Sequence, residues 1–275
     1  MSPPRAHLNA LPNQTIARVA GGLLAGTVIA TVLAACSPQL GGDLGQLQAM
    51  TGNCPQNTKT GMYVALDASD TARSSDISAS QLAVTKTMAE QTAVCGGHLR
   101  VTAFSSSAVA TVTLYDGDLT PAGATEPARL RRVPDMVNDT MKTTESQLSA
   151  AATKLPGDGS EIIAQLANVG EYGRQLGTGY VPYAVIVTDG VATAGTITNT
   201  PSFDAVTARD LGERVAVPDL TGATVTFTGI GHLAGPPPPS DYVANLKNFY
   251  TTVCNRTKAT TCTVVTDFAN PRSAS

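Results

Sequence analysis

The sequence predicts a three-layer α/β fold, doubly wound and Rossmann-like, with helices covering both faces of a mostly parallel sheet. From Lys59 onward, apolar runs of strand length alternate with segments of helix length, which is the pattern of a covered parallel sheet. One run, 109–115, follows the strand before it after only four residues, so a hairpin should make it an antiparallel edge strand. The length of 275 residues suits one domain of about 200 residues with extensions.

The first 35 residues are typical of a secretory signal. Arg5 and Arg18 are their only lysine or arginine residues, acids are absent, and 19–35 is an uncharged run. The sequence that follows, "LAAC" at 33–36, resembles the lipobox of bacterial lipoproteins, which implies that Cys36 carries the lipid. A membrane-spanning anchor is the alternative, although a span needs about 20 apolar residues and this run is short and broken by glycine. Either reading predicts a domain on the extracytoplasmic face of the cell membrane.

Four cysteines remain after Cys36, namely Cys54, Cys95, Cys254 and Cys262. An even number suits disulfides in an oxidising compartment, and three pairings are open. We favour Cys54 with Cys95 and Cys254 with Cys262, because the last two are close in sequence and should flank a helix end and the next strand. The chain has no C-x-x-C motif or Cys/His cluster, which argues against a zinc site.

The charge balance and the composition define the expected organisation. Eighteen basic residues against 21 acids provide no basic surface for nucleic acid. Residues 36–58 contain the lipidated cysteine and a Gly-, Gln- and Asn-rich stretch that we interpret as a flexible tether. The α/β domain should occupy 59–270, followed by a tail at 271–275.

The domain should contain six strands and five helices. The expected strands are 62–66, 99–104, 109–115, 183–188, 224–230 and 263–266. The expected helices are 78–94, 136–154, 160–172, a segment within 203–214, and 241–253. Ligands of such sheets bind beyond the carboxyl ends of the strands, so that edge is where a site is expected.

Oxygen-bearing side chains follow the expected strands at that edge. "DASDT" after the first strand supplies Asp67, Ser69 and Thr71, "TDG" supplies Asp189, and the loop before a helix supplies Ser160. Two carboxylates and three hydroxyls, without histidine or thiolate, suit Mg²⁺ or Mn²⁺. Ligation by uncharged hydroxyls leaves the cation with excess positive charge, so it should attract a carboxylate from elsewhere.

The segments "VALDASDT", "DGSEIIAQL" and "VIVTDG" resemble the metal-ion-dependent adhesion site of von Willebrand factor type A (vWA) domains. The D-x-S-x-S motif of that family falls on Asp67, Ser69 and Thr71, its threonine on Ser160, and its T-D-G aspartate on Asp189. Thr71 in place of Ser and Ser160 in place of Thr both keep the hydroxyl, and the similarity covers about 59–270. The resemblance implies that the three hydroxyls bind the cation directly. The two aspartates would bind it directly or through water, and an Asp or Glu of a partner protein would complete the shell.

Other interpretations of these motifs are weaker. Asp67, Ser69 and Thr71 alone would suit a capped turn. A phosphotransferase needs D-x-D-x-T, and position 69 is Ser. "GIGHLAG" at 229–235 lacks dinucleotide-binding spacing, and four prolines follow it.

Three residues outside the motif receive ordinary interpretations. We expect Asp116 and Asp118 to lie in a glycine-containing turn and not in a second cation site. His232 is expected to be a loop histidine.

These observations favour a surface lipoprotein that binds a protein or another acidic ligand through Mg²⁺ or Mn²⁺ and is not an enzyme. The alternatives are a metal-independent interaction or scaffold module and, less favoured, an accessory subunit of a hydrolase.

Overall fold

A computed structural model describes residues 43–107 and 110–268. The expected signal segment, Cys36, the first part of the expected tether and the tail at 271–275 lie outside the described residues. Across the described ranges, no helix combines the length and the hydropathy that crossing a bilayer requires.

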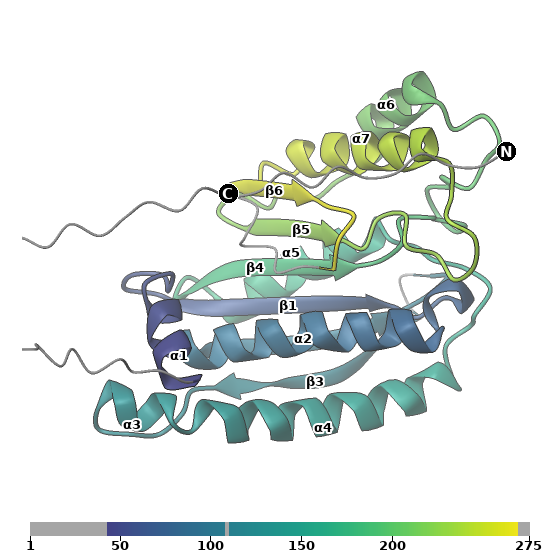
Figure 1. Cartoon of the computed structure of the whole chain (residues 1–275). Helices are drawn as coiled ribbons and strands as arrows, with labels where there is room; N and C mark the ends of the chain where they lie inside the picture. Colours follow the sequence, from purple (N-terminus) through teal and green to yellow (C-terminus); the bar gives the residue numbers. More distant parts are fainter. Residues whose placement is uncertain (1–42, 108–109, 269–275) are drawn as a thin grey trace, which may run out of the picture. The chain divides into compact units, whose positions relative to one another are not determined.

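A six-stranded sheet in the order β3-β2-β1-β4-β5-β6 forms the centre of the described domain (Figure 1). All neighbouring strands are parallel except β3, which pairs antiparallel with β2 at one edge. The predicted fold class and the antiparallel edge strand are therefore confirmed. The strands are β1 (Lys59–Asp67), β2 (Gly97–Phe104), β3 (Thr111–Leu119), β4 (Tyr180–Val187), β5 (Thr224–Thr228) and β6 (Thr261–Val264).

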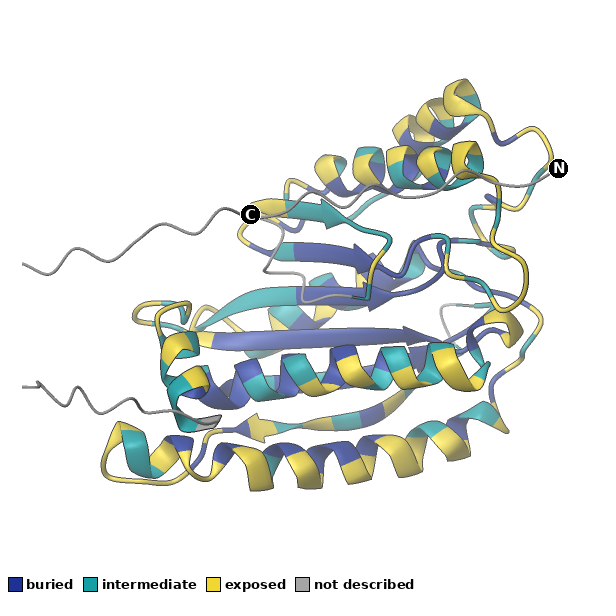
Figure 2. Ribbon diagram, in the orientation of Figure 1, coloured by how far each residue is buried: buried dark blue, intermediate teal, exposed yellow. Residues whose placement is uncertain are grey.

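Helices cover both faces of the sheet and bury its central strand β1, whereas the edge strands β3 and β6 stay partly exposed (Figure 2). One core lies beneath α2 and α4, and the other beneath α5 and α7. Alternate residues of β1 enter the two cores: Met62, Val64 and Leu66 face one, and Tyr63 and Ala65 face the other. The helices are α1 (Asp43–Thr51), α2 (Ser75–Cys95), α3 (Glu126–Leu130), α4 (Val133–Ala152), α5 (Ala164–Leu176), α6 (Ala205–Arg214) and α7 (Ser240–Arg256), with a 3₁₀ turn η1 (Asp70–Ala72).

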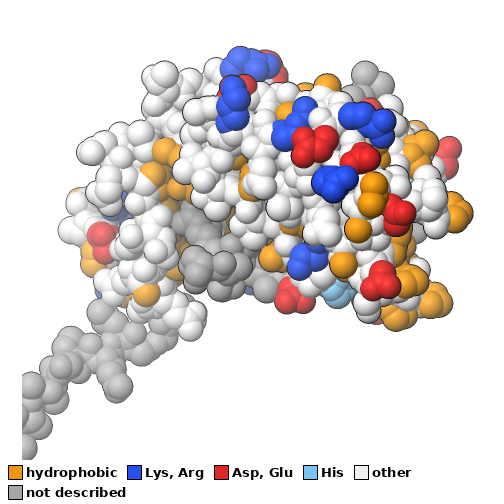
Figure 3. Space-filling view, turned by 90° about the horizontal axis from the view of Figure 1, so that it is seen from above, with side chains coloured by type: hydrophobic (Ala, Val, Ile, Leu, Met, Phe, Trp, Pro, Cys, Tyr) orange, Lys and Arg blue, Asp and Glu red, His pale blue; other side chains and the backbone are white. Residues whose placement is uncertain are grey.

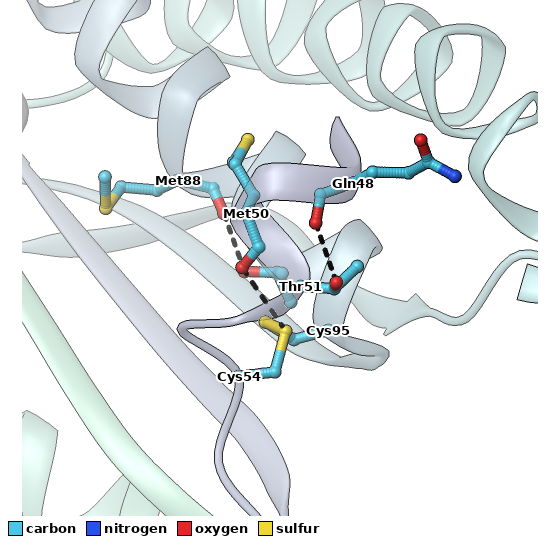
Figure 4. Close-up of a disulfide and its surroundings, with 7 residues drawn as sticks. Gln48, Met50, Thr51, Cys54, Met88 and Cys95 are labelled. Carbon is cyan, nitrogen blue, oxygen red and sulfur yellow. Dashed lines mark hydrogen bonds between the residues drawn. A yellow bond between two sulfur atoms is a disulfide. The ribbon is translucent and has the colours of Figure 1, made fainter. Parts of the chain in front are cut away.

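The prediction of a flexible tether at 36–58 is wrong from Asp43 onward, because α1 belongs to the folded domain. Leu47 is only 3% exposed, and Leu44 and Met50 pack against the same core. Three apolar residues at helical spacing bury one face of the helix, and the Gly- and Gln-rich surroundings hid that signal. Beyond α1, a disulfide joins Cys54 to Cys95 at the end of α2 (Figure 4).

Two other expectations also differ from the structure. Asp116 and Asp118 lie within β3 and not in a turn, and Asp116 forms an ion pair with Arg100 of the neighbouring strand at 2.8 Å. The cross-strand pair favours the extended backbone there. The helix expected from Ser160 starts at Ala164, which leaves Ser160 in the preceding loop. Most other element ends differ from expectation by a few residues.

Both disulfides that we favoured are present. Cys54–Cys95 and Cys254–Cys262 have Cα–Cα distances of 5.2 and 5.8 Å. The first closes a separation of 41 residues and the second a separation of 8. The longer loop should lose more entropy from the unfolded chain when it is closed.

We predict that Cys54→Ala with Cys95→Ala lowers the free energy of unfolding by roughly 4 kcal/mol, because the loop closure is lost and α1 is released. Urea unfolding without reductant measures this. Cys254→Ala with Cys262→Ala is the control, with a loss of roughly 2 to 3 kcal/mol. An equal or larger loss in the control would contradict the assignment of α1 to the stable core.

Candidate metal centre

Three segments far apart in the sequence meet at the carboxyl edge of the sheet. Asp67 is the last residue of β1, and Asp189 lies two residues beyond β4, the parallel neighbour of β1. Ser160 lies in the loop that leads from α4 to α5. Parallel neighbours end at the same edge, so β1 and β4 bring the two carboxylates together, and the loop adds the third hydroxyl.

The carboxylate of Asp67 is the centre of the cluster. Its Oδ2 accepts hydrogen bonds from Ser160 Oγ and Thr188 Oγ1, both at 2.7 Å. Its Oδ1 accepts one from the backbone N–H of Ser69 at 3.0 Å. Asp67 is 1% exposed, so these three donors replace water around a buried carboxylate.

The carboxylate of Asp189 connects the loop after β4 to Thr71, in the loop after β1. Asp189 Oδ2 accepts a hydrogen bond from Thr71 Oγ1 at 2.8 Å, and its Oδ1 accepts one from the N–H of Val191 at 2.8 Å. Ser69 Oγ lies 3.2 Å from Thr71 Oγ1. Thr71 is exposed whereas Ser69, Ser160 and Asp189 are buried, so the cluster reaches solvent on the Thr71 side.

Two buried carboxylates in one cluster are costly without a cation. Burial raises the pKa of Asp67, although hydrogen bonds from Thr188 and Ser160 oppose the shift. Burial and then the nearby Asp67 raise the pKa of Asp189 to about 7. Within 43–107 and 110–268, no group of three or more His, Cys, Asp or Glu side chains could hold a metal ion, and the candidate centre itself has two carboxylates.

The donor set suits a small hard cation. Ser160 and Thr71 direct their hydroxyl protons at carboxylates, so the lone pairs of both oxygens can face a metal. The available ligands are hydroxyl and carboxylate oxygens, the type that Mg²⁺ and Mn²⁺ prefer. All five predicted ligand residues therefore lie in one cluster with the chemistry that this cation requires, and its binding stays a prediction.

Several residues that hold the cluster in place were missed from the sequence. Thr188 donates to Asp67 and also accepts from the N–H of Gly190 at 3.1 Å. Gln81 of α2 donates from Nε2 to the carbonyl of Asp67 at 2.9 Å. Because Thr188 directly precedes Asp189 at the end of a strand, its hydroxyl could have been predicted as part of the cluster. Gln81 gave no signal, because only the packing of α2 brings it to β1.

Arg73 links the loop after β1, which carries Ser69 and Thr71, to the loop before α5, which carries Ser160. Its Nε donates to the carbonyl of Ala68 at 2.7 Å, and its Nη2 donates to the carbonyl of Leu155 at 2.9 Å. Asp70 is exposed and pairs with Arg73 at 3.4 Å. The guanidinium therefore holds the two loops in position. Its ion pair is with Asp70 and not with the buried carboxylates of Asp67 and Asp189.

A proline-rich loop forms one side of the rim. The N–H of Gly231 donates to the carbonyl of Asp189 at 2.8 Å, and the N–H of Ala234 donates to that of Thr71 at 3.3 Å. The exposed Pro236 and Pro237 follow. The ring of His232 packs on Phe268 with the centroids 5.1 Å apart, as befits a loop histidine.

Comparison with known proteins gives distant structural neighbours only. No family model and no curated protein matches the chain. The conserved hypothetical protein BatB from Bacteroides thetaiotaomicron is 13% identical, with 78% of this chain and 92% of that chain covered and a TM-score of 0.41. Proximal thread matrix protein 1 of the mussel byssus is 17% identical, covering 77% and 45% at a TM-score of 0.42. The pilus adhesin SpaC from Lactobacillus rhamnosus GG is 11% identical, covering 77% and 28% at a TM-score of 0.43.

The raised pKa of Asp189 predicts that the metal-free domain loses stability as the pH rises. The folded state holds a proton up to about pH 7, whereas an unfolded aspartate releases it near its ordinary value of 3.8. The stabilisation is therefore complete below pH 3.8 and is lost as the pH rises through 7. We expect the free energy of unfolding in EDTA to fall by about 2 kcal/mol between roughly pH 5 and pH 8.

Urea unfolding across this range measures the effect. Asp189→Asn removes the titrating group and should flatten the profile. Saturating Mg²⁺ should flatten it as well, because a cation stabilises the ionised form. A wild-type profile that Asp189→Asn leaves unchanged would contradict the assignment.

Proposed function

We propose that the chain is a lipid-anchored surface protein whose domain binds an acidic protein ligand through Mg²⁺ or Mn²⁺. The observation that carries this proposal is the cluster of Asp67, Ser69, Thr71, Ser160 and Asp189 at the carboxyl edge. Ser69 and Thr71 place their hydroxyl oxygens 3.2 Å apart, and Thr71 and Ser160 donate to the two carboxylates. The cluster opens to solvent at Thr71. We further propose that it belongs to the vWA type.

The bound cation would supply the attraction for a carboxylate of the partner. Asp67 and Asp189 would hold the hydroxyls of Ser160 and Thr71 in orientation, because each carboxylate accepts one of their protons. Direct ligation by uncharged hydroxyls would leave the cation with excess positive charge on its open side. The exposed side of Thr71 is where an incoming Asp or Glu side chain would approach.

We propose a binding role and not catalysis. The hydroxyls of Ser160 and Thr71 donate to carboxylates, so neither is paired with a histidine or lysine base that would activate it. His98 lies at the other end of β2, where its Nδ1 is 3.1 Å from the hydroxyl of Tyr172. The two alternatives remain a metal-independent scaffold module and an accessory subunit of a hydrolase.

We predict saturable binding of Mg²⁺ or Mn²⁺ to the EDTA-treated domain, measured by isothermal titration calorimetry. Asp189→Asn and Ser69→Ala should each weaken binding about tenfold or more, which corresponds to roughly 1.4 kcal/mol. Asp70→Asn is the matched control, since this exposed carboxylate lies between the ligands in sequence and should leave the affinity unchanged.

An equal response of wild type and all three variants would leave the metal-independent module as the better account. Turnover of a substrate that is lost in the same variants would favour the hydrolase alternative.

Membrane attachment has a separate test at Cys36. Cys36→Ser should release the protein from the membrane fraction, because the thiol that receives the lipid is gone. Fractionation of cells that express wild type and variant measures this. Unchanged fractionation would favour a spanning anchor over a lipid.

A further inference from the structure

Three arginines lie together at the edge of the sheet opposite the candidate metal centre. Arg129 is in the last turn of α3, and Arg131 and Arg132 connect α3 to α4. All three are exposed. The described chain contains no carboxylate within ion-pair distance of any of them, and Glu126 and Asp135 are the acids of the segment 126–135.

Helix electrostatics favours Arg129, which lies in the last turn of α3, but it does not account for Arg132. Arg132 is the N-cap residue of α4, a helix of 20 residues, and its side chain makes no capping hydrogen bond. Cations near a helix N-terminus face the positive end of the dipole, which disfavours them. Asp135 in the first turn opposes that cost only in part. Arg132 at the N-terminus of α4 therefore does not favour folding, and this indicates that it serves a function other than stabilising the fold.

The other basic side chains described at this edge form ion pairs or hydrogen bonds within the domain itself. Arg174 pairs with Glu171, and Lys258 pairs with Asp219 at 2.8 Å. Arg256 donates to the carbonyl of Gly212 at 2.8 Å. On the face formed by α6 and α7, basic and acidic side chains lie beside one another (Figure 3), as in the Arg209–Asp210 pair at 3.0 Å. The three arginines of α3 and α4 are different, because they remain available to a partner.

Their position places them beside the start of the folded domain. α1 contacts both α2 and α3, and the disulfide at Cys95 fixes the segment after α1 to the same edge. Figure 1 shows α1 and α3 at the end of the sheet away from the arrowheads of the parallel strands. Asp43 follows Cys36 by seven residues, a separation of at most about 25 Å when fully extended.

We propose that Arg129, Arg131 and Arg132 bind the anionic headgroups of the membrane that holds the lipid anchor. This inference rests on the proposed lipidation of Cys36. The lipid on Cys36 would hold the domain at the membrane surface, and a basic patch beside the start of the domain would add an electrostatic contribution. Each basic side chain near an anionic surface adds about a fivefold gain in binding.

The same contact would orient the domain. The opposite edge carries exposed acids, Asp204 at the N-terminus of α6 and Asp241 in the first turn of α7. An anionic membrane would repel that edge and attract the three arginines. The metal centre would then face away from the membrane by the length of β1, about 30 Å.

The test uses the unlipidated chain from Leu40, because Leu40–Ser275 forms one compact unit with its own cores. Sedimentation with vesicles of equal parts phosphatidylglycerol and phosphatidylcholine, in EDTA, measures binding without the lipid or the metal. We expect salt-sensitive binding that Arg129→Gln, Arg131→Gln and Arg132→Gln together weaken about a hundredfold. The matched control, Lys86→Gln, Lys142→Gln and Arg209→Gln, removes the same charge elsewhere and should change binding by less than about threefold.

A gain-of-binding variant keeps the test valid if the triple variant folds poorly. Glu126→Gln should strengthen binding about fivefold, because it removes the acid beside the cluster. Absence of wild-type binding, equal losses in the two triple variants, or preference for soluble dextran sulfate over vesicles would each overturn the proposal. Cation binding that persists in the arginine variant would show that the metal centre stands independently.

Discussion

The buried carboxylate of Asp67 is the group on which the arrangement of the carboxyl edge depends. It accepts hydrogen bonds from Ser160, Thr188 and Ser69, which belong to three segments of the chain. A carboxylate that is 1% exposed is tolerated only when such donors surround it. The donors in turn gain a fixed orientation, so one side chain determines where the loops of β1, α5 and β4 meet.

The same cluster places two buried carboxylates close together without a positive charge between them. Asp67 and Asp189 lie in one buried cluster, and the positive group next to it, Arg73, is engaged with the carbonyls of Ala68 and Leu155. Burial, and then the neighbouring Asp67, raise the pKa of Asp189, which therefore keeps a proton. A divalent cation would replace the proton and relieve the repulsion, and the hydroxyls are already oriented for it. This is the physical basis for expecting a metal and not merely a stable turn.

Much of this could be predicted from the sequence because the signals are local. Doubly buried strands such as β1 form continuous apolar runs, and four of the five candidate ligands lie at or just after the ends of β1 and β4. Ser160 lies in a loop between two helices, and the resemblance to the adhesion-site motif indicated it. The failures concern groups that tertiary packing brings together. The helix α1 has one buried face in a stretch rich in Gly and Gln, and Asp116 is held in β3 by Arg100 of another strand. Gln81 reaches Asp67 only because α2 packs across β1.

Direct location of a bound ion tests the central claim most sharply. Crystals of the domain grown with Mn²⁺ would give an anomalous signal at the metal. The account predicts one peak about 2.2 Å from the hydroxyl oxygens of Ser69 and Thr71, with Asp67 and Asp189 behind it. A peak elsewhere, for example at Asp116 and Asp118, or an empty cluster in Mn²⁺-saturated crystals would contradict it.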